Sequence, residues 1–336
     1  MKSPLLAVAW TRFQPRTVAI AAALGGEARF LDDRLTGSSI AARPLAYVSK
    51  AWRLWRMLAR EQPQSVLVIT PPVFAPLVAW AWCRVHRRRL IVDCHTGAFH
   101  SNRWAWARPI HRRVLRHATA VLLHTEELEE LVRGWGAPAM LVPDDLPEPA
   151  DAAPQLRHEG DCVLVAGSLD ANEPVAVAVE AARLQPDVRF RFTGDTRQVA
   201  PQIVEQAPAN VTFTGYLEYA AFLGEMLVAD VVAVFSTDPR IMNRAAFEAV
   251  GLGRPLVLSD LPALKSRFGD GPLMCANDPK AMADAVLEAL RQRDELAARS
   301  VALQTRLKAQ RAKAIARLQS IVDVGMEPLW RQRSAS

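Results

Sequence analysis

The 336-residue chain contains only four cysteines, and their placement argues against two kinds of protein. They stand at Cys83, Cys94, Cys162 and Cys275, and no two of them form a paired spacing. A small fold held by disulfides and a cysteine zinc site both depend on such pairs. The cysteine pattern therefore predicts a protein of a reducing compartment, and we expect a cytoplasmic location.

A long, uninterrupted apolar run is missing as well. Residues 66–83 are uncharged and long enough to be considered as a bilayer span, but prolines interrupt them. They predict instead a buried strand at 66–69 and a helix that starts at Pro72. The apolar residues 17–24 follow Arg16 and lie between two strand-like segments, so they predict a helix and not an export signal.

The net charge of +6 is modest, but basic residues gather in the first half with tryptophans between them. They are Arg84, Arg87, Arg88, Arg89, Arg103, Arg108, Arg112, Arg113 and Arg116, with Trp52, Trp55, Trp80, Trp82, Trp104 and Trp106. Indole rings favour the membrane interface, and arginine is attracted to anionic lipid. This pattern predicts contact with an anionic membrane surface; a solvated basic face over core tryptophans is the alternative. The cluster carries no nucleic-acid motif, so we expect no nucleic-acid partner.

Short apolar runs alternate with amphipathic runs, which is the pattern of βα units and a parallel sheet. In the first half, the expected strands cover residues 5–10, 28–31, 66–69, 90–93, 120–124 and 140–142. The expected helices cover residues 16–24, 47–61, 72–85, 105–117 and 126–135. Residues 143–160 are rich in Pro, Asp and Ala, and this composition predicts a linker.

The second half repeats the alternation. Its expected strands cover residues 162–166, 189–193, 211–214, 231–235, 256–258 and 273–275. Its expected helices cover residues 173–184, 219–228, 282–291 and, as a long closing helix, 295–321. We therefore expect an α/β protein with two Rossmann-like domains, residues 1–150 and 151–325, that face each other across a cleft. Ligands of open parallel sheets bind outside the carboxyl ends of the strands, so loops of both halves should face that cleft.

The most specific pattern lies at residues 244–260, which read RAAFEAVGLGRPLVLSD. A short helix that carries Glu248 is followed by a glycine-bounded turn at 251–253 and by a strand that starts after Pro255. Glycine ends helices because it accepts a positive φ, and proline cannot continue one. A carboxylate in this position can accept hydrogen bonds from ribose or sugar hydroxyls.

This segment resembles the nucleotide-sugar signature of the retaining glycosyltransferases with two Rossmann-like domains, the GT-B fold of the family 4-like or group 1 enzymes. Four weaker motifs resemble the same family in the same order: AGSL at 166–169, FTGD at 192–195, NVTFTGY at 210–216 and ADVVAVFS at 229–236. The resemblance implies a hexosyltransferase-like enzyme that moves a sugar from a nucleotide-diphosphate sugar to an acceptor hydroxyl with retention. It implies no metal or other cofactor.

The resemblance places the donor in the second half. The donor-site candidates are Gly167, Ser168, Gly194, Asp195, Arg240, Asn243, Arg244 and Glu248. Glycines let a backbone approach a ligand, and N–H groups near a helix start hold a diphosphate. The alternative is that Gly167 and Gly194 serve tight turns. Glu248 would bind the ribose hydroxyls, and its alternative is a carboxylate on the helix surface.

The chain departs from the family pattern at two positions. Arg240 stands where the family has its first glutamate, and Glu173 stands near the place of a lysine that contacts the diphosphate. Arg240 or Arg244 is one candidate replacement for that lysine, because a guanidinium matches phosphate geometry. The alternative is that either arginine pairs with Asp238 or Glu248.

In the first half, Asp93-Cys94-His95 resembles the "D-x-H" segment that follows the corresponding strand in many of these enzymes. We predict that His95 and Asp93 are catalytic, because histidine and aspartate at a strand end can position an acceptor hydroxyl or accept its proton. The acceptor-side candidates on neighbouring loops are Arg16, His100 and Asn102, with His124 as a weaker one.

Two other classes stay open at this point. A nucleotide-sugar epimerase-like enzyme needs an acid and a base around one sugar carbon, and the sequence shows no second clustered carboxylate pair. A non-catalytic sugar-nucleotide binding protein with a decayed site is consistent with the replaced glutamate. For the transferase, the expected partners are a nucleotide sugar, a saccharide or lipid-linked acceptor and the inner face of a membrane. Surface polysaccharide or glycolipid assembly is the process that fits them.

Overall fold

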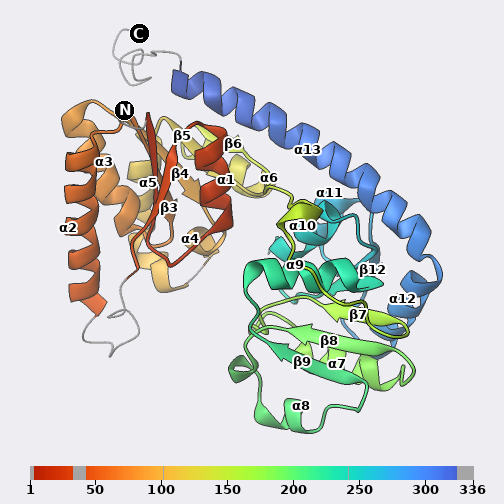
Figure 1. The fold of residues 1–336 in the computed structure, drawn as a ribbon. Helices are drawn as coiled ribbons and strands as arrows, with labels where there is room; N and C mark the ends of the chain where they lie inside the picture. Colours follow the sequence, from red (N-terminus) through yellow and green to blue (C-terminus); the bar gives the residue numbers. More distant parts are fainter. Residues whose placement is uncertain (1–3, 33–42, 101, 241, 324–336) are drawn as a thin grey trace. The chain divides into compact units, whose positions relative to one another are not determined.

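The protein consists of two compact units (Figure 1), and the computed structural model describes residues 4–32, 43–100, 102–240 and 242–323. The first unit contains Met1–Asp144 and Gln310–Ser336, and the second contains Asp145–Ala309. Each holds a six-stranded parallel sheet with interleaved helices. The α/β class with two Rossmann-like domains is therefore confirmed.

In the first unit the strand order is β2-β1-β3-β4-β5-β6. The strands are β1 (Leu5–Ala9), β2 (Glu27–Phe30), β3 (Ser65–Thr70), β4 (Arg89–Cys94), β5 (Ala120–Leu123) and β6 (Ala139–Leu141). The helices are α1 (Pro15–Ala23), α2 (Arg43–Glu61), α3 (Phe74–His86), α4 (Gly97–His100), η3 (Asn102–Ala107), α5 (Arg108–Arg116) and α6 (Glu126–Gly134). The direction of winding reverses between β1 and β3, and such a switch point is where open sheets bind ligands.

In the second unit the strand order is β12-β11-β10-β7-β8-β9. The strands are β7 (Cys162–Val165), β8 (Arg189–Thr193), β9 (Val211–Gly215), β10 (Val231–Val234), β11 (Leu256–Ser259) and β12 (Leu273–Cys275). The helices are η4 (Pro149–Asp151), α7 (Val175–Arg183), η5 (Thr196–Gln198), α8 (Pro201–Glu205), α9 (Tyr219–Val228), α10 (Arg244–Gly251), α11 (Pro262–Phe268), α12 (Pro279–Arg291) and α13 (Arg293–Asp323). Here the switch point lies between β7 and β10.

Local chemistry explains where these elements begin. β1, β3, β5 and β10 are apolar runs buried along their whole length, as expected for strands covered by helices on both faces. Pro15 begins α1, where its missing N–H costs no hydrogen bond. The Thr125 hydroxyl caps α6 by accepting the N–H of Leu128. α7 begins two residues later than expected, because Glu173 hydrogen-bonds to the preceding loop and Pro174 precedes the helix.

The closing helix α13 belongs to both units. Its earlier part contributes Leu303 and Leu307 to a core cluster of the second unit. Its later part contributes Leu318 and Val322 to a core cluster of the first unit. The chain thus crosses to the second unit after Asp144 and returns at Gln310, whereas the sequence predicts boundaries at residues 150 and 325. In the described part of the chain, no helix combines the length and apolarity needed to cross a bilayer.

Candidate active site

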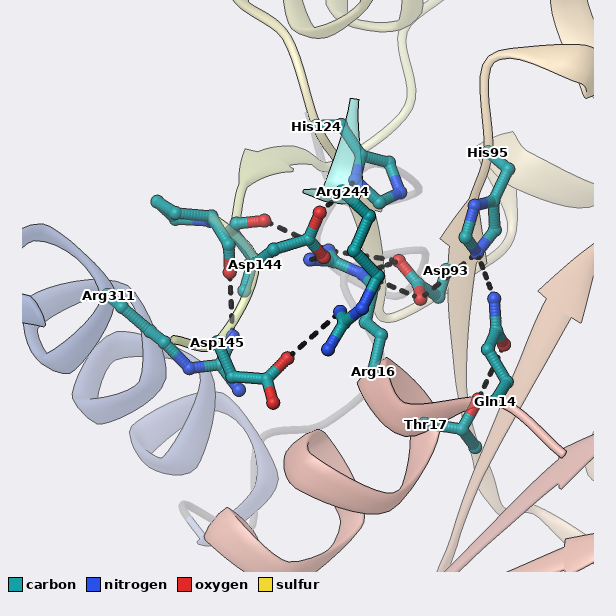
Figure 2. A network of polar contacts seen from close by, with 12 residues as sticks. Gln14, Arg16, Thr17, Asp93, His95, His124, Asp144, Asp145, Arg244 and Arg311 are labelled. Carbon is teal, nitrogen blue, oxygen red and sulfur yellow. Dashed lines mark hydrogen bonds and ion pairs between the residues drawn. The ribbon is translucent and has the colours of Figure 1, made fainter. Parts of the chain in front are cut away.

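In the first unit a buried arginine joins the carboxyl ends of three strands (Figure 2). Arg16 stands in the first turn of α1, after β1, and is 1% exposed. Its guanidinium donates to the two carboxylate oxygens of Asp93 at 3.0 and 3.2 Å, near the end of β4. It also donates to Asp144 Oδ1 at 2.8 Å and to the carbonyl oxygen of Val142 at 2.9 Å, both after β6. Arg16 therefore holds the carboxyl edge of the sheet together.

The charges of this cluster depend on one another. Burial acts to raise the pKa of Asp93, but Arg16, His95 and His124 outweigh it and hold that pKa below its usual value. Burial acts to lower the pKa of Arg16, and Asp93 and Asp144 outweigh it, so the guanidinium stays protonated. Removing one partner of such a buried pair typically costs about 3–5 kcal/mol, because an uncompensated charge is left behind.

His95 follows β4 and is fixed by a short chain of hydrogen bonds. The side-chain nitrogen of Gln14 lies 2.7 Å from His95 Nε2, and the hydroxyl of Thr17 donates to Gln14 Oε1 at 2.7 Å (Figure 2). With the amide donating, Nε2 is the acceptor and the proton of the neutral imidazole lies on Nδ1. The rings of His95 and His124 lie with their centroids 4.7 Å apart.

His95 is the member of this cluster that solvent reaches. Its side chain is 32% exposed, whereas those of Arg16 and Asp93 are 2% and 0% exposed. Burial lowers the pKa of His95 to about 4, and Asp93 only partly opposes this. The imidazole is therefore neutral at neutral pH and can accept a hydrogen bond or a proton from a hydroxyl.

Three side chains of this cluster also have the spacing of a metal site. Potential ligand atoms of Asp93, His95 and His124 lie within 4.8 Å of one another. However, both oxygens of Asp93 already accept hydrogen bonds from Arg16, and a guanidinium in contact with this carboxylate repels a cation. The donor set therefore does not fit a resident divalent ion, and a metal-free reaction stays a prediction.

The remaining first-half candidates are less informative. His100 ends α4, and its Nε2 atom is buried without a hydrogen-bond partner among the described residues. Asn102 begins η3, but its side chain lies outside the described part of the structure. Gln14 and Asp144 are not among the site residues that the sequence predicts. Their signal is position alone: both lie just beyond the carboxyl end of a strand in a sheet whose order the sequence does not show.

In the second unit the loops after β7 and β8 are in close contact. The hydroxyl of Thr193 accepts the N–H of Gly167 and donates to its carbonyl oxygen, both at 3.0 Å. Gly194 has a φ of +125°, and a Cβ there would lie 2.6 Å from the carbonyl carbon of Ser168. A Cβ on Gly167 would lie 2.3 Å from an oxygen of Glu173. The backbone conformation and the backbone contact therefore require glycine at 194, whereas at 167 a side chain would have to displace the Glu173 carboxylate. Contact of either glycine with a ligand stays a prediction.

The carboxylate of Glu173 occupies the N–H groups of the loop after β7. Its Oε1 accepts the N–H of Ser168 at 3.1 Å, and its Oε2 accepts the N–H of Leu169 at 2.8 Å. Burial raises the pKa of Glu173, although these bonds act to lower it. Successive N–H groups in a tight loop form an anion-binding nest. In this loop the bound anion is a side chain of the protein itself.

The loop after β10 adjoins the loop after β7 at the switch point. The carbonyl oxygen of Asn172 accepts the N–H of Thr237 at 2.7 Å and its hydroxyl at 3.0 Å. Farther along, Arg240 Nε lies 3.0 Å from Asp238 Oδ1. Arg240 thus forms the ion pair that the sequence leaves open as the alternative to diphosphate contact.

Asp195, another predicted donor residue, also has a partner within its own turn. Its carboxylate accepts hydrogen bonds from the guanidinium of Arg197 at 2.7 and 2.9 Å and caps η5. Side chains in such exposed pairs rearrange at little cost, since the pairs contribute about 0–1 kcal/mol. The ion pairs of Asp195 and Arg240 therefore do not prevent either side chain from contacting a ligand.

Glu248, on α10, belongs to a buried polar network. It is 3% exposed, and its Oε1 accepts a hydrogen bond from Arg244 Nε at 2.9 Å. Arg244 also donates to Asp145 Oδ1 at 3.3 Å and to Tyr219 Oη at 3.4 Å. Asn243 immediately precedes α10, and its Oδ1 is buried without a hydrogen-bond partner among the described residues. That orphaned acceptor is the position in this group where a ligand hydroxyl would supply a missing bond.

Both units are thus doubly wound, and both gather polar side chains at the carboxyl edge of the sheet near the switch point. These features define the class of two-domain Rossmann-like proteins with the GT-B fold. Residues 6–143 match the family described as "Glycosyl transferase 4-like domain", and residues 160–292 match "Glycosyl transferases group 1". The chain belongs to this glycosyltransferase family.

Solved structures with the same fold cover nearly the whole chain. Sucrose-phosphate synthase from Thermosynechococcus elongatus has a TM-score of 0.73 and 15% identity, over 98% of this chain and 99% of that one. HepE from Anabaena, in complex with UDP and glucose, has a TM-score of 0.71 and 14% identity, over 96% and 100%. An OtsA apo structure has a TM-score of 0.69 and 14% identity, over 97% and 100%. These likenesses establish the fold, whereas no curated protein sequence matches.

Proposed function

We propose that this glycosyltransferase takes a sugar from a nucleotide-diphosphate sugar and passes it, with retention, to a hydroxyl of a saccharide or lipid-linked acceptor. The observation that carries the donor assignment is the anion nest after β7, which lies within residues 160–292 that match the group 1 family. HepE, which has the same fold, has been solved with UDP-glucose, which supports a nucleotide-sugar donor.

In the second unit, the donor diphosphate takes the place of the Glu173 carboxylate on the N–H groups of Ser168 and Leu169. Arg240 exchanges Asp238 for the diphosphate and offsets the charge that develops on the leaving group. Such fixed donors and guanidinium groups can stabilise a leaving diphosphate without a metal. Glu248 keeps its bond to Arg244, and its carboxylate binds the ribose hydroxyls.

In the first unit, His95 binds the acceptor hydroxyl. Its neutral imidazole accepts the hydrogen bond through Nε2, once the hydroxyl displaces the amide of Gln14. Asp93 and Arg16 hold the strand end from which His95 projects. For retention, the acceptor attacks the face from which the diphosphate departs, and the leaving phosphate assists deprotonation. The paired carboxylates of a retaining glycosidase are then not needed.

The proposed setting is the cytoplasmic face of a membrane, in surface polysaccharide or glycolipid assembly. The four cysteines are free and buried, which is consistent with a reducing compartment. A lipid-linked acceptor would place the reaction at the membrane surface. Membership of the glycosyltransferase family favours this function over an epimerase-like reaction. A measurement of transferase activity distinguishes it from the other alternative, a binding protein with a decayed site.

The test is release of free nucleoside diphosphate from a panel of nucleotide sugars, with and without membrane extract. We expect release with one donor, stimulated by extract, and retention in the product by the anomeric coupling constant in NMR spectra. Binding of nucleoside diphosphate by calorimetry without release from any donor would identify a decayed site. If the protein neither binds a nucleoside diphosphate nor releases one from any donor, the proposal is wrong.

A further inference from the structure

The first unit has a hollow of about 1730 Å³ whose lining is strongly basic. Among the described residues, ten arginines and no aspartate or glutamate line it. They include Arg84 on α3, Arg112 and Arg113 on α5, and Arg317 on α13. Several basic side chains around one concave surface raise the local concentration of anions.

The hollow lies at the opposite edge of the sheet from the candidate active site. Arg89, Ala120 and Ala139, which begin β4, β5 and β6, line it. Asp93 and His95 lie at the other end of β4, about 15 Å away at the rise of a parallel strand. The hollow is therefore spatially separate from the Arg16 cluster.

Within the described part of the chain, few carboxylates offset this positive charge. Arg133 pairs with Glu129 at 2.6 Å, and Arg89 donates to the carbonyl oxygen of Val322. No carboxylate of the described residues forms an ion pair with Arg84 or Arg112. Arginines gathered without carboxylates repel one another, and an occupant with several negative charges would relieve this repulsion.

The size of the hollow favours an extended occupant. Small-molecule pockets usually have volumes of about 300–1,000 Å³ and are mostly apolar. This hollow is larger, and apolar side chains such as Trp80, Leu90 and Trp135 lie between its arginines. Several phosphate groups on one amphiphilic surface fit it better than a single small anion.

A second feature adjoins the hollow: an exposed apolar stripe on α2, defined by Leu45, Val48, Trp52 and Trp55. These residues are 69%, 65%, 58% and 37% exposed. Their spacing of three or four residues places them on one face of the helix. An amphipathic surface helix normally packs such an apolar face against the core, whereas the stripe on α2 is exposed to solvent.

The stripe reaches the arginines of the hollow. α2 packs on α3 in the first unit (Figure 1). The ring of Trp55 lies with its centroid 6.5 Å from that of His86, which ends α3 two residues after Arg84. Val85, between them in sequence, is also exposed. One side of the first unit thus presents exposed indole and aliphatic side chains next to a basic hollow.

We propose that the hollow and the α2 stripe together dock the first unit on an anionic phospholipid membrane. The arginines bind headgroup phosphates, and the indole rings enter the interface, where an amphipathic ring is most stable. The inference rests on the proposed function in that a lipid-linked acceptor lies in the same membrane. A duplex nucleic acid would satisfy the arginines but would leave the apolar stripe uncovered, so the lipid surface accounts for both features.

The first test is co-sedimentation with phosphatidylglycerol-containing vesicles and with pure phosphatidylcholine vesicles. The triple variant Arg84→Gln, Arg112→Gln and Arg113→Gln should bind anionic vesicles on the order of 100-fold more weakly, at about fivefold per arginine. The control triple variant is Arg183→Gln, Arg189→Gln and Arg291→Gln, which removes the same charge from the second unit. If both triple variants lose the same vesicle affinity, or if wild type binds both vesicle types equally, the proposal is overturned.

The second test addresses the stripe. Val48→Ser with Trp52→Ser should weaken vesicle binding even in high salt, where charge attraction is screened. Leu156→Ser with Leu184→Ser is the matched control, because both leucines are exposed in the second unit. If the stripe variant binds vesicles normally but turns a dimer into a monomer, the stripe is a protein interface and the proposal is wrong.

Two further measurements separate this inference from the proposed function. With a soluble acceptor, the rate of sugar transfer, measured as release of nucleoside diphosphate, should be unchanged in the arginine triple variant, because the hollow lies away from the active site. Normal vesicle binding without any transferase activity would contradict the proposed function and leave the docking surface standing. Tighter binding to a duplex DNA oligonucleotide than to anionic vesicles at the same salt would show that the hollow is a nucleic-acid site.

Discussion

The carboxylate of Glu173 accepts the backbone N–H of Leu169 at 2.8 Å and so fills the anion nest after β7 with a side chain of the protein itself. Leu169 has a φ of +65°, a backbone conformation that residues other than glycine rarely adopt. The nest is therefore held in its anion-binding shape before a nucleotide arrives. The same carboxylate competes with any diphosphate for these N–H groups.

The first prediction concerns this competition. Glu173→Gln should bind the donor's nucleoside diphosphate about tenfold more tightly than wild type, because a neutral amide holds the N–H groups more weakly than a carboxylate. Isothermal calorimetry of the diphosphate measures this directly. Asp170→Asn is the control: it removes one charge from the same loop, but Asp170 bonds to the Ser168 hydroxyl and not to the nest.

The pH dependence of binding gives an independent check. Burial raises the pKa of Glu173, so wild type should bind the diphosphate more tightly as the pH falls toward that value and the carboxylate is neutralised. Glu173→Gln has no such group, and the nucleotide's own phosphates titrate equally in both experiments. Weaker binding by the variant at every pH would show that Glu173 supports the loop and does not compete.

The second prediction concerns the stability of the first unit. Arg16→Met keeps much of the side-chain volume but leaves Asp93 and Asp144 buried without their cation, and should lower the free energy of unfolding by about 3–5 kcal/mol. Urea unfolding followed by tryptophan fluorescence is the measurement, because all described tryptophans lie in the first unit. Adding Asp93→Asn should restore part of the loss. A loss below about 1 kcal/mol would mean that the cluster is not a buried charge network.

The pKa of Asp93 gives this prediction a pH signature. It is lower in the folded protein than its usual value, so the stability it contributes is complete above the unfolded pKa, about 4. That stability is lost as the pH falls through the lower folded pKa. Wild type should therefore lose stability over this acidic range, and a variant with Asp93→Asn should lose less.

The third prediction is the pH profile of transfer. His95 has a pKa of about 4, so its imidazole is neutral from about pH 5 upward, and kcat should show no inflection near the ordinary histidine value of about 6.5. His95→Ala should lower kcat on the order of 10²-fold, because the acceptor hydroxyl loses the hydrogen bond that positions it, and should change the affinity for the nucleoside diphosphate little. An inflection near 6.5 that His95→Ala removes would show that the ring titrates normally.

The fold was readable from the sequence, because strand and helix periods are local. Apolar runs such as 120–124 correspond to buried strands, and Asp93 lies near the carboxyl end of β4 with His95 just beyond it, as expected. Contacts between distant segments were not readable. Arg16 and Asp144 are 128 residues apart, and their pairing depends on a strand order that no local pattern encodes. The sequence likewise marks Glu173 as a departure from the family but does not show that its carboxylate binds its own loop.

The fourth prediction separates two roles of Glu248. Its carboxylate accepts a hydrogen bond from Arg244, so loss of the charge affects both the network and any bound ribose. Glu248→Gln should raise the dissociation constant of a nucleoside diphosphate roughly tenfold and leave the affinity for inorganic pyrophosphate unchanged, because only the nucleoside has a ribose. Arg244→Gln is the matched control, since it breaks the same ion pair from the other side. If the two variants lose nucleotide affinity equally, Glu248 acts through Arg244 and is not the ribose ligand.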